Sequence, residues 1–270
     1  MPSLPLLIRA CHPEPTAAVT ALAATLAWAA GADPLVVGAA FLSGQLSIGW
    51  SNDWIDAARD RAVGRADKPT VRGLPVPVLR AAALLAGTAC LPLSLLMGPK
   101  AGLAHLIAVT SGWLYNLRLK STAWSFLPYA VSFGLVPCVV ALAAPGQQLA
   151  PWWAIAAGAL LGVGAHGANV LPDLDDDLAT GVVGLPHRLG RGLTTLLSGL
   201  ALVLATVLLA VGPGLSPVGG TAVVLSVLVF GLGLALGRRP GSRAAFLSVI
   251  VVALLDVGLL VLQGADLAGG

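Results

Sequence analysis

Charged residues are absent from long stretches of this chain, and that scarcity limits what the chain can fold into. Only 10% of the 270 residues are charged, 57% are hydrophobic, and the mean hydropathy is +0.90. A soluble domain carries about 25% charged residues. A helix needs about 20 apolar residues to cross a bilayer, and several stretches of this chain are that long. We therefore predict an all-α, polytopic membrane protein that folds as one domain over residues 1–270.

Nine apolar stretches are predicted as transmembrane helices, separated by Gly, Pro and polar clusters. They cover residues 15–31, 34–51, 77–97, 101–117, 123–143, 152–171, 192–211, 217–237 and 243–263. Apart from Lys100, the basic residues precede the first span or lie in or beside the connections after spans 2, 4, 6 and 8. The positive-inside rule then predicts a cytoplasmic N-terminus and an outside C-terminus. We expect a multi-pass protein of a bacterial plasma membrane.

The net charge gives no sign of a nucleic-acid partner. The formal charge is +3, and the basic residues are scattered over short loops without forming a stripe. Nucleic-acid binding calls for a concentrated basic surface. We expect the lipid bilayer, and no nucleic acid, to surround this chain.

Two clusters of Asn and Asp follow the second and the sixth predicted spans with one shared spacing, Asn-x3-Asp-x3-Asp. The members are Asn52, Asp56 and Asp60 in the first cluster and Asn169, Asp173 and Asp177 in the second. Residues four apart stack on one face of a helix, so each cluster is predicted to form a stripe of one amide and two carboxylates. Such stacked charges repel one another, and unpaired carboxylates near a membrane are costly. The stripes therefore call for a compensating cation.

The ligand chemistry of the stripes indicates magnesium. Hard oxygen ligands suit Mg²⁺, which keeps several waters and shares its coordination with phosphate oxygens. Two facing clusters could hold two or three ions around a diphosphate and help its carbon–oxygen bond to ionise. One cluster alone would equally fit a solvated helix end, but the repeated spacing on one membrane face argues against that interpretation.

Basic residues beside the clusters are candidates for binding a diphosphate. Arg65 and Lys68 follow the first cluster, Lys120 follows the fourth span, and Arg188 follows the second cluster. The alternative for each is a charge that only sets membrane topology.

Four further residues are candidates for lining a cavity: Trp50, Trp54, Trp113 and His166. The tryptophans could stabilise a carbocation with their π faces. His166 lies one helical turn before Asn169, and the alternative for it is an interhelical hydrogen bond.

The two clusters and their neighbours resemble the signatures of a known family. Asn52-Asp53-x2-Asp56-x3-Asp60-x4-Arg65-x2-Lys68-Pro69 resembles the first signature of the UbiA superfamily of intramembrane prenyltransferases. The second signature is similar to Asp173-x3-Asp177-x3-Gly181, and a shorter element between them is similar to Tyr115-x3-Leu119-Lys120. The resemblance covers essentially the whole chain. One departure is Lys68, where many members have Arg, because lysine lacks the bidentate fork.

The resemblance implies nine helices around a central cavity, with a cytoplasmic cap formed by the connections after spans 2 and 6. It implies transfer of a prenyl group from a prenyl diphosphate to an aromatic or other lipophilic acceptor, with Mg²⁺ held by the two clusters. Arg65, Lys68, Tyr115 and Lys120 would help to grip the diphosphate. An allylic carbocation would form, and Asp173 or Asp175 would accept the acceptor's proton. Asp53 is a further catalytic candidate.

Two other functions remain open. Some UbiA-like proteins are terpene cyclases, in which the ionised chain attacks its own double bonds, and their binding motifs would be identical. A divalent-cation transporter could also use acidic stripes. Transporter sites lie near the bilayer midplane, however, whereas these carboxylates gather at one membrane face.

Overall fold

The computed structural model describes residues 4–62, 64–239 and 242–267, and every regular element in these ranges is helical. The long helices there are α2 (Pro13–Ala29), α3 (Pro34–Ala62), α4 (Val76–Leu96), α5 (Pro99–Leu117), α6 (Leu127–Ala143), α7 (Trp152–Val170), α9 (Leu185–Val211), α10 (Pro217–Gly237) and α11 (Ala244–Leu262). The short ones are α1 (Leu4–Ala10), α8 (Leu174–Ala179), α12 (Gly264–Leu267) and a 3-10 turn, η1 (Leu119–Ser121). The predicted all-α class is confirmed, and each predicted span overlaps one long helix.

Five of these helices are long and apolar enough to cross a membrane, namely α4, α7, α9, α10 and α11. Helix α6 is apolar but shorter. Large apolar side chains also cover the outside of the bundle: Leu35 is 82% exposed, Leu85 70% and Leu262 73%. Apolar surface of this extent is unstable in water and suits lipid. The prediction of a polytopic membrane protein is thus supported, while the count of nine spans and the orientation of the termini stay predictions.

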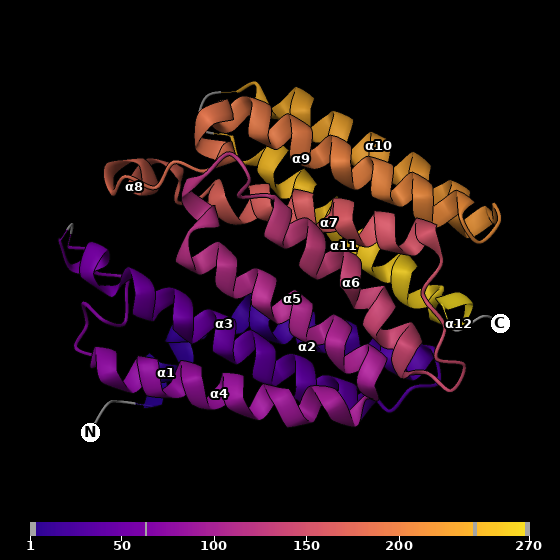
Figure 1. Ribbon diagram of the computed structural model, residues 1–270. Coiled ribbons are helices and arrows are strands. Elements are labelled where there is room, and N and C mark those ends of the chain that lie inside the picture. The colour runs from indigo at the N-terminus through magenta and orange to yellow at the C-terminus, as the bar shows by residue number, and fades with distance from the viewer. Residues whose placement is uncertain (1–3, 63, 240–241, 268–270) are drawn as a thin grey trace.

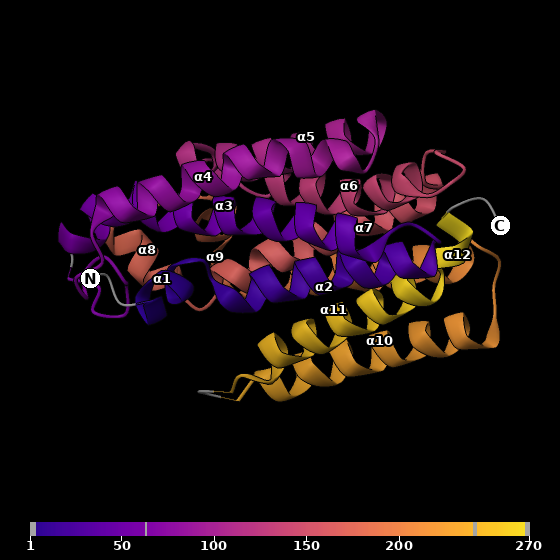
Figure 2. The same cartoon turned by 90° about the horizontal axis from the view of Figure 1, so that it is seen from below.

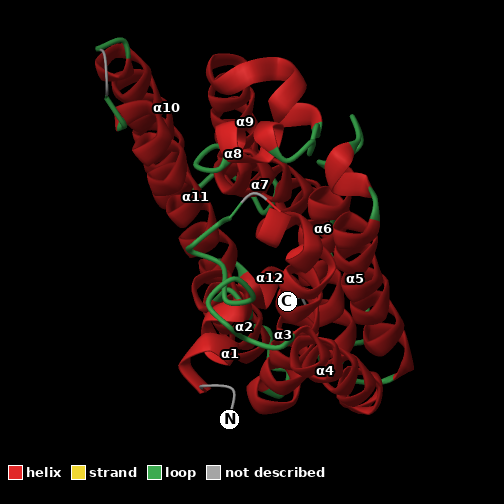
Figure 3. Ribbon diagram, turned by 90° about the vertical axis from the view of Figure 1, so that its left-hand side faces the viewer, coloured by secondary structure: helices red, strands yellow, loops and turns green. Residues whose placement is uncertain are grey.

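Six helices form a closed ring. Helix α2 packs on α3, α3 on α5, α5 on α6, α6 on α7, α7 on α11, and α11 returns to α2. Helix α4 lies outside the ring against α3 and α5, and α10 lies outside against α9 and α11. Viewed from one end of the bundle, α10 and α4 lie at opposite edges (Figure 3). The interior of the ring is therefore the place where a cavity can form.

Glycines allow two close approaches that shape this ring. A Cβ at Gly162 of α7 would collide with the carbonyl of Tyr129 on α6, and a Cβ at Gly49 of α3 would collide with the carbonyl of Cys11. Small residues let membrane helices pack closely in this way. As a result α6 and α7 are in direct contact, and the segment before α2 lies against α3.

The two ends of the bundle differ. Helices α1 and α8 lie at one end, and α12 lies at the other (Figures 1 and 2). Helix α3 extends to Ala62 at the α1/α8 end, eleven residues beyond its predicted span, because the first cluster continues the helix. Both clusters therefore lie at the same end of the molecule.

Candidate functional site

The first cluster lies on one continuous helix, as predicted. Asn52, Asp56 and Asp60 all belong to α3, and the two aspartates are only 8% and 3% exposed. Asp56 forms ion pairs with Lys120 of η1 and with Arg59, whose Nη2 is 2.7 Å away. Burial lowers the pKa of Lys120, and the neighbouring Asp56 opposes that shift. The positive charges beside Asp56 thus balance one carboxylate of the stripe.

Asp60 is the least satisfied member of this cluster. Its Oδ2 atom is buried, and no hydrogen-bond partner for it exists among the described residues. Burial raises the pKa of Asp60, and the positive charge of Lys68 offsets part of that shift. A buried carboxylate oxygen without a partner costs free energy. This atom is therefore a suitable ligand for an added cation.

The second cluster is divided between two helices. Helix α7 ends at Val170, and Asp173 precedes the separate short helix α8. Proline is common just after a helix end because it cannot continue the helix, and Pro172 occupies this position. The prediction of one continuous stripe is therefore wrong for this cluster. Asn169 lies on α7, Asp173 directly precedes α8, and Asp177 lies on α8.

Arg65 joins the two clusters across more than a hundred residues of sequence. Its backbone N–H donates to the carbonyl of Asp60 in the first cluster at 3.1 Å. Its side chain is 13% exposed, and its guanidinium nitrogens lie 3.4 Å from Asp173 and 4.0 Å from Asp177. His187 lies 3.4 Å from the other oxygen of Asp177. Burial raises the pKa of Asp177, and His187 counteracts part of that effect. The two clusters consequently face one another at one end of the bundle.

A cavity of about 260 Å³ opens inside the ring, between α2, α3, α5, α6 and α7. One amide of each cluster, Asn52 and Asn169, lines it. The other lining residues include Val19, Ile48, Tyr115, Tyr129 and Phe133. A second hollow of about 30 Å³ shares Gln45 and Phe133 with the first and continues to His105. The site thus combines polar amides with an apolar and aromatic interior.

The predicted diphosphate-binding residues take different positions. Tyr115 lines the cavity, and Lys120 is buried against Asp56. Lys68 lies 3.4 Å from Asp53, which is itself only 1% exposed and is not part of the cavity wall. Arg188 is exposed on α9.

His12 is a site residue that the sequence did not reveal. It lies before α2 with a positive φ of 54°, lines the cavity, and places Nε2 3.1 Å from Asp53 Oδ1. A lone histidine ahead of the first span belongs to no helical pattern, so no signal in the sequence connects it with Asp53.

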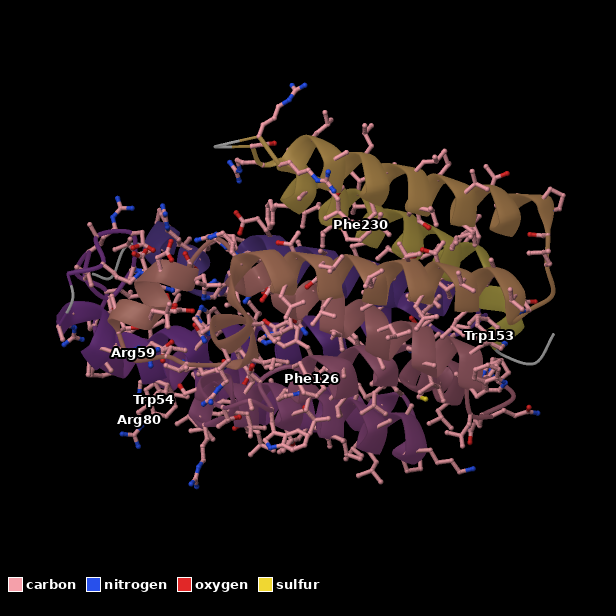
Figure 4. The ribbon with its side chains drawn as sticks, turned by 90° about the horizontal axis from the view of Figure 1, so that it is seen from above. Trp54, Arg59, Arg80, Phe126, Trp153 and Phe230 are labelled. Carbon is pink, nitrogen blue, oxygen red and sulfur yellow. The ribbon has the colours of Figure 1, made fainter. Side chains whose placement is uncertain are left out.

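The three tryptophans predicted for the cavity are not among the residues found to line it. Trp50 Nε1 donates to the carbonyl of Leu7 at 2.9 Å, which fixes α1 against α3. Trp54 meets Trp113 edge-on with ring centroids 6.3 Å apart. The guanidinium of Arg80 lies 5.7 Å from the Trp54 ring, and Figure 4 labels both residues at the same end of the molecule. These rings therefore pack α1, α3, α4 and α5 together.

His166 lies behind the cavity wall. Its ring is 5.0 Å from that of Tyr129 and 5.8 Å from that of Tyr115, and Nε2 is 3.0 Å from Ser125 Oγ. Ser125 lies in the turn before α6, so this hydrogen bond joins α7 to a turn and not to another helix. His166 supports two aromatic rings that do face the cavity.

The available ligands fit a hard divalent cation. The described residues contain no cluster of three or more His, Cys, Asp or Glu side chains arranged to hold a metal ion. Most of the carboxylates are instead paired with basic side chains, while Asp60 Oδ2 has no partner. Such oxygen ligands suit Mg²⁺ that shares its coordination with substrate phosphates better than a metal held by protein alone.

The chain belongs to the UbiA prenyltransferase family, whose family model matches residues 15–261. A UbiA homolog from Archaeoglobus fulgidus bound to GPP and Mg²⁺ has a similar structure, with a TM-score of 0.71 and 15% identity over 96% of this chain and 99% of that one. An apo UbiA homolog from Aeropyrum pernix K1 has a TM-score of 0.69 and 20% identity over 93% and 98% of the two chains.

A structure of digeranylgeranylglyceryl phosphate synthase has a TM-score of 0.69 and 15% identity over 99% of this chain and all 100% of its own. At these identities the structural likeness establishes the fold alone. No curated protein sequence matches the chain.

Proposed function

We propose that this protein is a Mg²⁺-dependent intramembrane prenyltransferase that moves a prenyl group from a prenyl diphosphate to an aromatic or other lipophilic acceptor. The proposal rests on one observation: an amide from each cluster, Asn52 and Asn169, lines the same largely apolar cavity. A diphosphate between the clusters would direct its prenyl tail into that cavity. The homologous structures bound to GPP and to DMAPP with Mg²⁺ support this assignment.

In this proposal the two clusters hold the metal. The ligands are Asn52, Asp56, Asp60, Asn169, Asp173 and Asp177. Bound Mg²⁺ would neutralise charge on the diphosphate and make it a better leaving group.

The basic residues that now pair with carboxylates would bind the diphosphate. Arg65 contacts Asp173, Lys68 contacts Asp53, and Lys120 contacts Asp56. When the substrate enters, these side chains exchange carboxylate oxygens for phosphate oxygens, which releases Asp56 and Asp173 to act as metal ligands. The ion pairs therefore keep the carboxylates and the basic side chains together at the site, in positions suited to the metal and to the diphosphate.

The aromatic side chains of the cavity would stabilise the positive charge on the prenyl group. As the carbon–oxygen bond breaks, its electron pair leaves with the diphosphate and the allylic carbon becomes cationic. The π faces of Tyr115, Tyr129 and Phe133 favour a cation nearby. The acceptor then forms its bond to that carbon and loses a proton. We assign the proton to Asp173, because Asp175 is 81% exposed and pairs with Arg191 at 2.8 Å.

We also propose nine transmembrane helices, with the N-terminus and the site at the cytoplasmic face and the C-terminus outside, in a plasma membrane. The distribution of Arg and Lys over the connections supports this orientation. The clusters lie at the ends of α3 and α7 and on the segment that follows α7, and the connections after these two helices would cap the cavity from that face.

A terpene cyclase of the same family is the competing function, and the aromatic lining of the cavity is the observation that favours it. Incubating the purified protein with Mg²⁺ and geranyl, farnesyl or geranylgeranyl diphosphate, without acceptor, separates the two. We expect no turnover until an aromatic or lipophilic acceptor is added. A cyclic hydrocarbon or alcohol in the absence of acceptor would instead establish the cyclase, and no consumption of diphosphate with any acceptor would refute both.

A further inference from the structure

Asn116, in the last turn of α5, makes several contacts with α3, and the mechanism above gives it no role. Asn116 is 2% exposed and lines the cavity. Its amide contacts three groups of α3: the side chain of Asn52, the carbonyl of Ile48 and the hydroxyl of Ser51. A buried amide in contact with a proposed metal ligand deserves a functional explanation.

The hydrogen bonds determine which way the Asn116 amide points. A backbone carbonyl can only accept a hydrogen bond, so the atom 2.9 Å from Ile48 O must be the donor, Nδ2. Ser51 Oγ donates its own proton to the same carbonyl at 2.8 Å, which leaves it free to accept from Asn116 Nδ2 at 2.9 Å. The remaining atom of Asn116, Oδ1, can only accept.

The same logic then determines the orientation of Asn52. The atom of Asn52 that lies 3.0 Å from Asn116 Oδ1 must be a donor, so it is Nδ2. The oxygen of Asn52 therefore occupies the other position of the amide, and no hydrogen bond to it occurs within the part of the chain that the structure describes. An isolated asparagine side chain could turn its nitrogen toward a cation as readily as its oxygen. Only the oxygen is a ligand.

We infer that Asn116 is a positioning residue, which holds Asn52 with its amide oxygen turned away from α5 and available to a divalent cation. This inference rests on the proposed function, since it assumes that Asn52 is a metal ligand. Asn116 acts entirely through Asn52 and needs no contact with the ion or the substrate. Residues that orient metal ligands typically change metal affinity about 10- to 100-fold when they are replaced.

The test measures metal binding and needs no turnover. Mn²⁺ takes the same oxygen ligands as Mg²⁺ and is detected by electron paramagnetic resonance. The purified full chain is titrated with Mn²⁺ in the presence of inorganic diphosphate. We expect Asn116→Leu to weaken Mn²⁺ binding about tenfold. Asn116→Ala, which removes the amide without adding bulk, gives the same measurement if the leucine variant does not fold.

Two double variants test whether Asn116→Leu weakens Mn²⁺ binding by disturbing Asn52. If it does, Asn52→Leu combined with Asn116→Leu binds Mn²⁺ no more weakly than Asn52→Leu alone. In an Asn52→Asp background, Asn116→Leu should cost nothing, because a carboxylate presents an oxygen whichever way it turns. The inference would be overturned if the double leucine variant bound Mn²⁺ about tenfold more weakly than Asn52→Leu alone. It would also be overturned if Asn116→Leu weakened Mn²⁺ binding about tenfold in the Asn52→Asp background.

Gln263→Leu is the matched control. Gln263 Nε2 also donates to a backbone carbonyl of another helix, that of Leu209, at the α12 end of the bundle. Its replacement removes a comparable interhelical amide contact and should leave Mn²⁺ binding unchanged. An equal loss in this control would show that Asn116 acts only by stabilising the fold. If the wild-type chain binds no Mn²⁺ with diphosphate present, the proposed function itself fails, which is a distinct outcome.

Discussion

The two acidic clusters share one spacing but differ in structure. The first lies on an unbroken helix, with both aspartates buried and Asp56 paired with Lys120. In the second, the side chains of Asp173 and Asp177 are 50% and 24% exposed, and they lie beyond the break that follows α7. A shared spacing therefore fixes which residues form a cluster, whereas the local chain decides how rigid that cluster is.

The difference suggests a division of labour between the clusters. A buried, ion-paired cluster is costly to disturb, because removing one charge leaves its partner buried without compensation. A partly exposed cluster at a short helix can adjust to a substrate at less cost. We expect substitutions in the first cluster to affect both stability and turnover, and substitutions in the second to affect turnover alone.

Asp56→Ala should have the largest effect. It removes a proposed metal ligand and leaves Lys120, which is 8% exposed, without its carboxylate. We expect turnover to fall about 1,000-fold, and the free energy of unfolding to fall by about 3 kcal/mol. Product formation at saturating Mg²⁺ and chemical unfolding in detergent measure the two quantities. As a control, adding Lys120→Met should restore part of the stability and none of the turnover. Full activity in Asp56→Ala would contradict the metal assignment.

Asp173→Asn should lower turnover while leaving the free energy of unfolding nearly unchanged. We expect turnover to fall about 100-fold, because the variant loses a proposed ligand and proton acceptor. The free energy of unfolding should change by less than about 0.5 kcal/mol, because the side chain is half exposed. The same two assays apply. A loss of stability as large as that of Asp56→Ala would remove the proposed contrast between the clusters.

The sequence predicted the fold well because hydropathy dominates a membrane protein. Long apolar stretches bounded by Gly and Pro left little choice of where helices lie, and each predicted span overlaps a helix. The repeated Asn/Asp spacing likewise marked both clusters. The relative positions of two residues on a single helix, such as Asn52 and Asp56, follow from helical periodicity alone.

The parts of the site that depend on tertiary packing could not be predicted. Pro172 ends α7 between Asn169 and Asp173, which interrupts the stripe that the spacing indicated. Trp50 and Trp54 pack between helices because their neighbours are in contact only in the folded bundle. The position of His12 beside Asp53 depends on the close approach of Cys11 to Gly49. No local sequence pattern predicts that approach.

The unpartnered carboxylate of Asp60 leads to a prediction about pH. Burial raises the pKa of Asp60 above its usual 3.8 in the folded protein. Without Mg²⁺, the folded protein therefore binds a proton on Asp60 more tightly than the unfolded chain does. Protonated Asp60 thus favours the folded state at low pH, and this contribution to stability is lost as pH rises from about 3.8 through the raised pKa. Asp60→Asn should remove this loss and raise the free energy of unfolding at pH 7 by about 1 kcal/mol.

Thermal unfolding between pH 4 and pH 8, with EDTA and with Mg²⁺, measures this effect. Mg²⁺ should stabilise the wild-type protein, because it supplies the missing partner, and should stabilise Asp60→Asn less. Asp177 also has a raised pKa, so some pH dependence remains in the variant. Equal stabilisation of both proteins by Mg²⁺ would argue against Asp60 as a ligand.

Asp175→Asn should have the smallest effect on turnover and stability. It tests whether an exposed carboxylate of α8 takes part in the reaction. Its side chain is 81% exposed and pairs with Arg191, which is itself 52% exposed. Exposed pairs of this kind contribute about 0–1 kcal/mol. We expect turnover within about twofold of wild type and unfolding within about 0.5 kcal/mol. A loss of turnover comparable to that of Asp173→Asn, with unchanged stability, would move the proton acceptor to Asp175. It would also require α8 to turn toward the cavity during the reaction, which would make the second cluster the mobile half of the site.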